Sequence, residues 1–323
     1  MLKFQNMNET PIIISGSIAI DRIMNFSNHY KDLIKPEKIH ILSISIFLDK
    51  LKDTHGGNGA NISYSLALLG EKPILIGSVG PDAKDYIKKL TKFGIDTNSV
   101  FFSQLPTASF NVMTDLDDNQ IGGFYPGAMF DNQNSSFKNW KDKNAFFVIS
   151  PDDPKLMDRL IDECQKYKLK MLYDFGQQVT NSSPELLTKG IKTAEIVIAN
   201  DYEMSVLSDK IKLTLSQIKK IVPICITTLS DKGSIIEGKN IKKPINIRPV
   251  KTKKLLDPTG AGDAFRSGFV YGYVRNWDLK ICGQVGSLIA TYAVETFGTQ
   301  DHLFTKKEFA KRYYKNYNQT LNI

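Results

Sequence analysis

From about residue 140 onward, short apolar runs alternate with amphipathic stretches along the chain. The runs are "AFFVIS", "LKMLYDF", "EIVIAND" and "VPICITTL", and stretches such as "DPKLMDRLIDECQKY" and "PELLTKGIKTA" lie between them. Runs of this kind are typical of parallel strands buried on both faces, and the stretches between them of crossover helices. Further strands are expected at 11–20 and 73–79, and helices at 58–69, 262–275 and 278–295. The pattern predicts an α/β fold, a doubly wound and mainly parallel sheet flanked by helices, as one domain over residues 1–323.

Two segments depart from this rhythm and predict a small β lid formed by insertions at about 38–54 and 105–127. Residues 39–51 alternate apolar with polar side chains, as a half-exposed strand does, and residues 107–126 indicate a hairpin that turns at "DLDDN". With that turn centred at Asp117, Phe110 and Phe124 face each other across the hairpin. The two rings could clamp a flat ligand, or they could pack into the lid's own core.

Composition argues against several classes of protein. The net charge is +8, but the lysines are scattered and no basic and aromatic RNA-binding motif occurs, so no nucleic-acid partner is expected. The apolar runs are too short for a membrane span, and the start "MLKFQNMNETPIIISG" predicts a strand and no signal peptide. The cysteines Cys164, Cys225 and Cys282 are far apart, which favours buried free thiols. We expect a cytoplasmic protein that does not bind membranes.

One glycine-rich segment imitates a phosphate-binding P-loop. "GSIIEGKN", residues 233–240, matches G-x-x-x-x-G-K, but the next residue is Asn240 where Ser or Thr would hold magnesium. Pro244 and Pro249 follow and exclude a helix there. A hairpin turn at "EGKN" is therefore expected.

The stretch "LLDPTGAGDAFRSGF", residues 255–269, fits phosphate chemistry better. Gly260, Ala261 and Gly262 carry almost no side chain and precede an apolar-periodic helix, whose first N–H groups have no partners within the helix. A phosphate can approach these amides directly, aided by the helix dipole. Asp263 would then lie where a general base for an attacking hydroxyl is needed. The alternative is a glycine-rich turn with Asp263 as a first-turn acid that the dipole favours.

A helix N-terminus stabilises the carboxylate and so makes Asp263 a weak base. This difficulty is smaller if bond formation to the nucleophile lags behind loss of the leaving group. The hydroxyl proton then transfers late, when the oxygen is already acidic.

Other polar residues have both a structural and a functional interpretation. Gly56 and Gly57 could form a turn or admit a ligand, and Asn61 could start a helix or bind sugar hydroxyls. Asp21 follows the first strand, near the sheet edge where open α/β folds bind ligands. Asn200 and Glu203 have capping-box spacing and could also lie beside a metal-bound phosphate.

In combination, "DPTGAGDAF", "GGNGAN" and "NDYE" resemble the PfkB, or ribokinase-like, carbohydrate kinase family over nearly the whole chain. The resemblance implies a ribokinase-like fold, ATP as co-substrate and Mg²⁺ as cofactor, and also a monovalent cation such as K⁺. It implies Asp263 as base, an anion hole at Gly260, Ala261 and Gly262, and sugar contacts from residues Asp21, Gly56, Gly57 and Asn61. Asn200 and Glu203 would help to place magnesium and phosphate, with Glu203 reaching the metal through water.

"GSIAIDR", "SISIFLDKL", "FYPGAM" and "DPTGAGDAFRSGF" resemble the bacterial adenosine kinase branch, which implies phosphorylation of the ribose 5′-hydroxyl of adenosine in purine salvage. Phe110 and Phe124 would then sandwich the purine, and Ser17 and Ser45 would add polar contacts. "TTLSDKGS" resembles the family's nucleotide-binding loop, which implies ATP contacts from residues Thr228, Lys232 and Gly233. "DFGQQ" at residues 174–178 resembles the branch as well, but no role follows for Gln177 or Gln178.

Two rival functions remain open. The same chemistry could act on another nucleoside, on ribose or on a sugar phosphate, although phosphosugar kinases need cationic groups near the acceptor where this lid offers aromatic ones. A nucleoside sensor without catalysis is the rival of another class, and an intact Asp263 speaks against it, because a pure binder needs no base. An exposed edge strand of the lid could also pair with a second subunit to form a homodimer.

Overall fold

The computed structural model describes residues 10–117, 119–132 and 134–323, and within them the strands form one sheet of nine and one of four. In the larger sheet, the strands from β5 to β11 pair in parallel, and β12 and β13 add an antiparallel edge. This confirms the predicted sheet. In spatial order its strands are β13 (Ile245–Ile247), β12 (Ser234–Glu237), β11 (Ile224–Thr228), β10 (Ile196–Asn200), β9 (Met171–Tyr173), β8 (Phe146–Ile149), β1 (Ile12–Ser15), β4 (Ile74–Val79) and β5 (Val100–Phe102).

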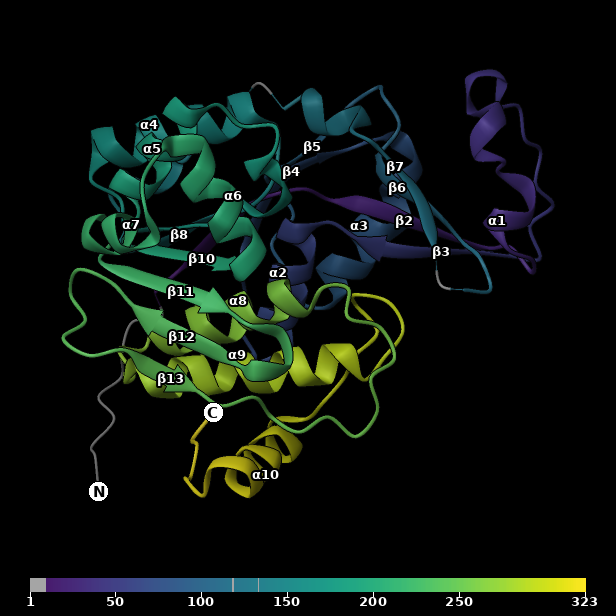
Figure 1. Cartoon of the computed structure of the whole chain (residues 1–323). Coiled ribbons are helices and arrows are strands. Elements are labelled where there is room, and N and C mark those ends of the chain that lie inside the picture. Colours follow the sequence, from purple (N-terminus) through teal and green to yellow (C-terminus); the bar gives the residue numbers. More distant parts are fainter. Residues whose placement is uncertain (1–9, 118, 133) are drawn as a thin grey trace.

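Helices cover both faces of this sheet, because successive strand residues point to opposite sides and are apolar on each (Figure 1). Ile12 and Ile14 pack toward one helical layer and Ile13 toward the other. The first layer holds α2 (Asn58–Leu68), α3 (Lys84–Lys92), α8 (Ala261–Tyr273), α9 (Leu279–Val294) and α10 (Lys306–Tyr317), and the second α4 (Pro154–Tyr167), α5 (Pro184–Thr193), α6 (Asp201–Ile211) and α7 (Leu215–Ile221).

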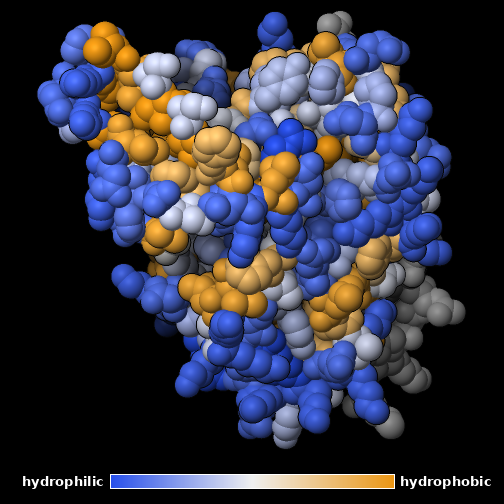
Figure 2. Space-filling model, turned by 90° about the vertical axis from the view of Figure 1, so that its right-hand side faces the viewer, coloured by the Kyte–Doolittle hydropathy of each residue, from blue (hydrophilic) through white to orange (hydrophobic). Residues whose placement is uncertain are grey.

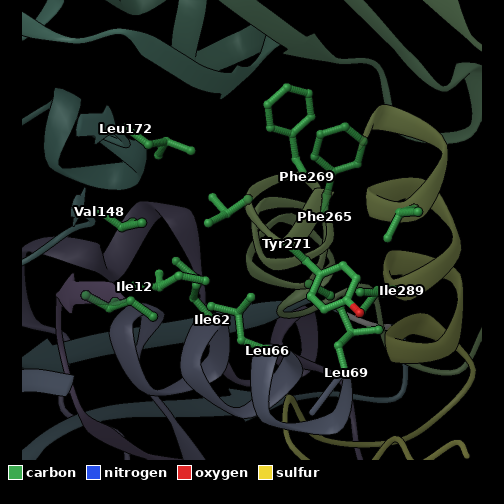
Figure 3. Packing of buried hydrophobic residues seen from close by; sticks show 14 of the residues in the cluster. Ile12, Ile62, Leu66, Leu69, Val148, Leu172, Phe265, Phe269, Tyr271 and Ile289 are labelled. Carbon is green, nitrogen blue, oxygen red and sulfur yellow. The ribbon is translucent and has the colours of Figure 1, made fainter. Parts of the chain in front are cut away.

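The first helical layer positions the helix that carries Asp263. Figure 3 shows Phe265 and Phe269 on α8 together with Ile289 from α9 and Ile62 from α2. All four side chains are buried, so α8 is held by apolar packing along its length. Its N-terminus is thereby fixed relative to α2, which starts at the second glycine-rich segment.

The smaller sheet forms a lid that projects from the main body (Figure 1). Its strands are, in order, β3 (Lys50–Gly56), β2 (Ala19–Asn25), β6 (Ala108–Thr114) and β7 (Gln120–Tyr125). The predicted hairpin is confirmed, with Phe110 directly opposite Phe124; residue 118 of its turn lies outside the described residues. The short helix α1 (Tyr30–Leu33) and the 3-10 turn η1 (Pro36–Ile41) lie between β2 and β3. Other 3-10 turns are η2 (Pro81–Ala83), η3 (Gly127–Phe130), η4 (Lys138–Trp140), η5 (Gly176–Val179) and η6 (Ser230–Lys232).

Two strand predictions near the N-terminus are wrong in extent. The single strand predicted over residues 11–20 is two strands, because the chain leaves the large sheet after Ser15 and enters the lid as β2. The strand predicted over residues 39–51 is absent from residues 42–48, which are neither helix nor strand, and pairing begins only at β3. The alternating residues there are mostly exposed and have no partner strand within the described ranges, so their pattern forms no ladder. Residues 1–9 of the predicted N-terminal strand lie outside the described residues.

Two smaller predictions are confirmed. Cys164, Cys225 and Cys282 are free and buried. The P-loop imitation forms strand β12 followed by a turn, and no helix follows it. Across the described ranges, no helix combines the length and apolar character that a membrane span requires.

Candidate active site

The candidate site is built around the start of α8. Gly260 precedes the helix with φ of +77°, a left-handed conformation in which glycine is unstrained, and as N-cap it has no side chain to cap the first helical N–H groups. Asp263 lies in this first turn and is 5% exposed. Gly260, Ala261 and Gly262 therefore present backbone amides beside a buried carboxylate, the arrangement predicted for anion binding.

Both oxygens of the Asp263 carboxylate accept hydrogen bonds from the start of α2. Asn58 Nδ2 donates to Oδ1 and Asn61 Nδ2 donates to Oδ2, each at 2.9 Å. Gly57 makes this approach possible: its φ is +94°, and a Cβ there would lie 2.5 Å from the Ser17 carbonyl oxygen. The two glycine-rich segments, about 200 residues apart in sequence, thus form one site.

Burial raises the pKa of Asp263, and the charge of Arg266 and the two amide donors oppose this rise. Because its pKa is raised, the Asp263 carboxylate is a stronger base than it would be if only the helix dipole acted on it. The difficulty noted from the sequence, that the helix dipole weakens the base, is therefore partly offset by the desolvation of the side chain.

Asp21 belongs to the same site through the lid sheet. On β2 it lies opposite Thr54 on β3 and Phe110 on β6, and Phe110 lies opposite Phe124 on β7. In-register partners share a face, so these four side chains form a row across one face of the lid. Burial, together with the negative charges of Asp263 and Asp257, raises the pKa of Asp21 to about 6. A Cβ at Gly56 would lie 2.3 Å from Asp21 Oδ2, so the missing side chain makes room for this carboxylate.

The two phenylalanines are not part of the lid's core. Phe110 and Phe124 are 38% and 48% exposed, whereas the buried cluster at the base of the lid consists of Ala19, Ala108 and Met129. The core-packing interpretation of the aromatic pair is therefore wrong. Figure 2 shows the side of the molecule on which the lid projects, where hydrophobic residues gather at the surface. These rings are available to cover a flat apolar ligand.

The residues predicted to hold ATP lie at the carboxyl ends of β10 and β11. Asn200 and Thr228 are register partners, and both end their strands. The capping box is confirmed, because Asn200 Oδ1 accepts from Glu203 N at 2.7 Å and Glu203 Oε2 accepts from Asn200 N at 2.9 Å. The loop after β11 carries Lys232, whose side chain is exposed, and Gly233, which directly precedes β12.

The two predicted serines differ in their placement. Ser17 Oγ accepts a hydrogen bond from Asn58 N at 3.0 Å, so it lies directly beside the residues that hold Asp263. Ser45 lies in the exposed stretch 42–48, which forms no regular structure, and the structure does not bring it to the site.

Several polar residues of the site had no role assigned from the sequence, or a different one: "TFGTQ", residues 296–300, was expected to border the ATP base, and Gln177 had no role. Gln177 Nε2 donates to Asn58 Oδ1 at 3.1 Å, which gives that glutamine a contact one step from Asp263. Thr299 Oγ1 and Gln300 Nε2 both donate to Asn61 Oδ1 at 2.9 Å. Asn58 lies inside the quoted "GGNGAN" segment, but its contacts with Asp263 and Gln177 appear only in the folded structure.

Comparisons with known proteins agree on one family. The sequence profile described as "pfkB family carbohydrate kinase" matches residues 18–306. A nucleoside kinase of Methanothermobacter thermautotrophicus is 30% identical over 309 residues, 94% of this chain and 95% of that protein. The structure of Burkholderia thailandensis nucleoside kinase in complex with inosine has a TM-score of 0.86 at 28% identity, covering 96% of this chain and 99% of that one. The Methanocaldococcus jannaschii nucleoside kinase structure has a TM-score of 0.83 at 28% identity, covering 95% and 99%.

Proposed function

The chain belongs to the pfkB family of carbohydrate kinases, and from this premise we propose that it phosphorylates the ribose 5′-hydroxyl of a purine nucleoside, adenosine in the first place. Membership confirms the family predicted from the motifs, and the chain is an ATP-dependent phosphotransferase. The observation that carries the proposal is the buried Asp263, held by Asn58 and Asn61 at an uncapped helix N-terminus. A kinase needs a carboxylate and an anion site side by side there.

Each residue of the site has a proposed task in the transfer. The amides of residues 260–263 would bind the moving phosphoryl group, and Asp21 and Asn61 would hold the ribose hydroxyls. Asp263 would accept the proton of the 5′-hydroxyl as the new P–O bond forms and the bond to the leaving ADP breaks. Closure of the lid over the acceptor would exclude water from the reaction.

The aromatic pair supports a nucleoside as acceptor. Phe110 and Phe124 share the lid face that carries Asp21, so a ribose bound at Asp21 would place its base between or against the rings. A bare pentose would leave both rings exposed. Inosine is bound in the Burkholderia thailandensis relative, which makes it the strongest alternative to adenosine.

The residues near the ATP side suit a hard cation. Glu203 uses Oε2 in the capping box, and its second oxygen remains available to a magnesium-bound water. Oxygen donors of this kind fit Mg²⁺, which would neutralise charge on the transferring phosphates. We also propose dependence on a monovalent cation such as K⁺, tested by replacing K⁺ with choline in the assay.

A homodimer through the lid is part of the proposal. Leu51, Met24, Met113 and Ile121 form an in-register row on the lid face opposite Phe110, and Leu51 and Ile121 are exposed. A second copy could cover this apolar row. Light scattering of wild type and of Ile121→Glu would test it, with a shift from dimer to monomer expected in the variant.

A coupled assay of ADP release tests the function. The acceptors are adenosine, inosine, guanosine, ribose and fructose 6-phosphate, and Asp263→Asn serves as the inactive control. We expect a purine nucleoside to give the highest kcat/KM, with adenosine ahead of inosine. A preference for ribose or fructose 6-phosphate over every nucleoside would contradict the proposal. Nucleoside binding without turnover would favour the sensor.

A further inference from the structure

A buried arginine lies beside the proposed base. Arg266 follows Asp263 by one turn of α8 and is 7% exposed, on a helix whose other buried residues are mostly apolar. Its Nη1 atom lies 3.8 Å from Asp263 Oδ1, and its Nη2 atom donates to Asp174 Oδ1 at 2.7 Å. A buried guanidinium is costly unless it is paired, so this position needs an explanation.

Asp174 anchors the guanidinium to the sheet. It follows β9, is fully buried, and its second oxygen accepts from Ser150 Oγ at 3.0 Å. Ser150 follows β8, the neighbouring strand. The arginine head group is therefore tied to the carboxyl ends of two strands, while its backbone belongs to α8. It joins the helix that carries the base to the sheet edge on which the site is built.

The guanidinium also lies against the turn that was assigned to phosphate binding. A Cβ at Gly262 would come within 2.5 Å of Arg266 Nη1. The absence of a side chain at Gly262 thus leaves room for Arg266 as well as for a phosphate. The backbone directly before Asp263 is packed on the arginine.

Asp263 is consequently held from two sides. Asn58 and Asn61 donate to its two oxygens from α2, and the positive charge of Arg266 lies on the α8 side next to Oδ1. We propose that Arg266, anchored by Asp174, is a positioning residue that fixes the Asp263 carboxylate in the orientation needed to accept the acceptor's proton. This inference rests on the proposed role of Asp263 as base, but it does not depend on which acceptor the enzyme prefers.

The test separates positioning from simple stabilisation of the fold. The variants are Arg266→Gln, Arg266→Lys and Asp174→Asn, with Arg275→Gln as matched control, since it removes another arginine–carboxylate pair, to Glu71, away from Asp263. Each variant is assayed with whichever acceptor of the panel gives wild type its highest turnover. Thermal unfolding is measured alongside kcat and both KM values, and kcat is expressed per folded enzyme.

We expect Arg266→Gln to lower kcat by about 100-fold, because a displacement of the base of about 1 Å costs that much, with both KM values within about threefold of wild type. Arg266→Lys should recover about tenfold of this loss, since it keeps the charge without the planar fork. It also keeps the test decisive if the glutamine variant does not fold. Asp174→Asn should also reduce kcat, because it weakens the anchor of Arg266, and Arg275→Gln should leave kcat unchanged.

Two results would overturn the inference in distinguishable ways. Wild-type kcat in Arg266→Gln, or in Arg266→Lys if the glutamine variant does not fold, with a lowered melting temperature and an inactive Asp263→Asn, would reduce Arg266 to a structural ion pair and leave the proposed function intact. Near wild-type kcat in Asp263→Asn would remove the base, and with it both the proposed mechanism and the positioning role.

Discussion

The two halves of the candidate site are built in opposite ways. Around Asp263 the polar side chains are largely buried and contact one another before any ligand arrives, with Asn58, Asn61, Arg266 and Asp174 in one connected set. On the lid, Phe110 and Phe124 are half exposed, and every residue of β7 is exposed. If Asp263 is the base as proposed, this end of the site is preorganised, which would minimise reorganisation during the transfer. In the proposed function, the lid would gain most of its contacts only when a ligand covers it.

The largest effect is expected at the preorganised end. Asp263→Asn keeps the size of the side chain but removes the acceptor of the proton and turns an amide donor toward Asn58 or Asn61, so kcat should fall by about 10²–10⁴-fold. Nucleoside affinity, measured by calorimetry, should change little, because the variant retains the donors around the site. Activity within tenfold of wild type would show that the preorganised carboxylate is not the base.

Asp21 lies between the two halves of the site. Replacing it should weaken nucleoside binding but stabilise the fold. Asp21→Asn should raise the nucleoside KM by about 100-fold, because a charged hydrogen-bond acceptor for the ribose is lost. Its pKa of about 6 in the folded state lies above the usual value, so ionised Asp21 destabilises the fold as pH rises from about 4 to about 6.

The stability effect of Asp21→Asn should therefore depend on pH. Above pH 6 the variant should be more stable than wild type, by an amount on the order of 1–3 kcal/mol, and near pH 4 the two should converge. Urea unfolding at pH 4.5 and pH 7.5 measures this difference. The same difference in unfolding free energy between variant and wild type at both pH values would show that burial does not destabilise the ionised Asp21 carboxylate. The wild-type nucleoside KM should also rise as pH falls below 6.

The lid should respond in KM alone. Phe124→Ala should raise the nucleoside KM about tenfold, since an aromatic contact to the base is lost, and leave the KM for ATP unchanged. Ile121→Ala on the opposite face of β7 is the matched control and should leave the nucleoside KM unchanged. An equal nucleoside KM for Phe124→Ala and wild type would show that the Phe124 ring does not contact the bound nucleoside.

The smallest effect is expected from the outer member of the buried set. Gln177 contacts Asn58, which in turn contacts Asp263, so Gln177→Ala should lower kcat roughly threefold to tenfold through a less fixed Asn58. Gln177→Glu should lower kcat more than Gln177→Ala does, because it places a hydrogen-bond acceptor opposite the Asn58 side-chain oxygen. Steady-state kinetics of both variants against Gln178→Ala distinguish a specific contact from general disturbance of η5.

Much of the fold followed from local pattern, and the failures have a physical cause. The strands and helices after residue 140 were predictable because buried parallel strands and amphipathic helices differ clearly in period. The structure of segment 39–51 was not predictable in this way. Alternation of apolar and polar residues gives a strand only where a partner strand exists, and residues 42–48 have none among the described residues. The division of 11–20 into β1 and β2 likewise depends on which sheet each half joins.

Of the site, the sequence by itself determined the residues whose roles are local. The bare turn before Asp263, the capping box at Asn200 and the opposition of Phe110 and Phe124 all follow from spacing within one segment. Tertiary structure decided the contacts of Arg266 with Asp174 and of Gln177 with Asn58, since these pairs are separated by 92 and 119 positions. Contacts between residues so far apart in sequence do not change the periodic pattern of hydrophobic residues, so the pattern cannot predict them. They exist because α2, α8 and the strand ends converge, and burial then requires each polar group there to find a partner.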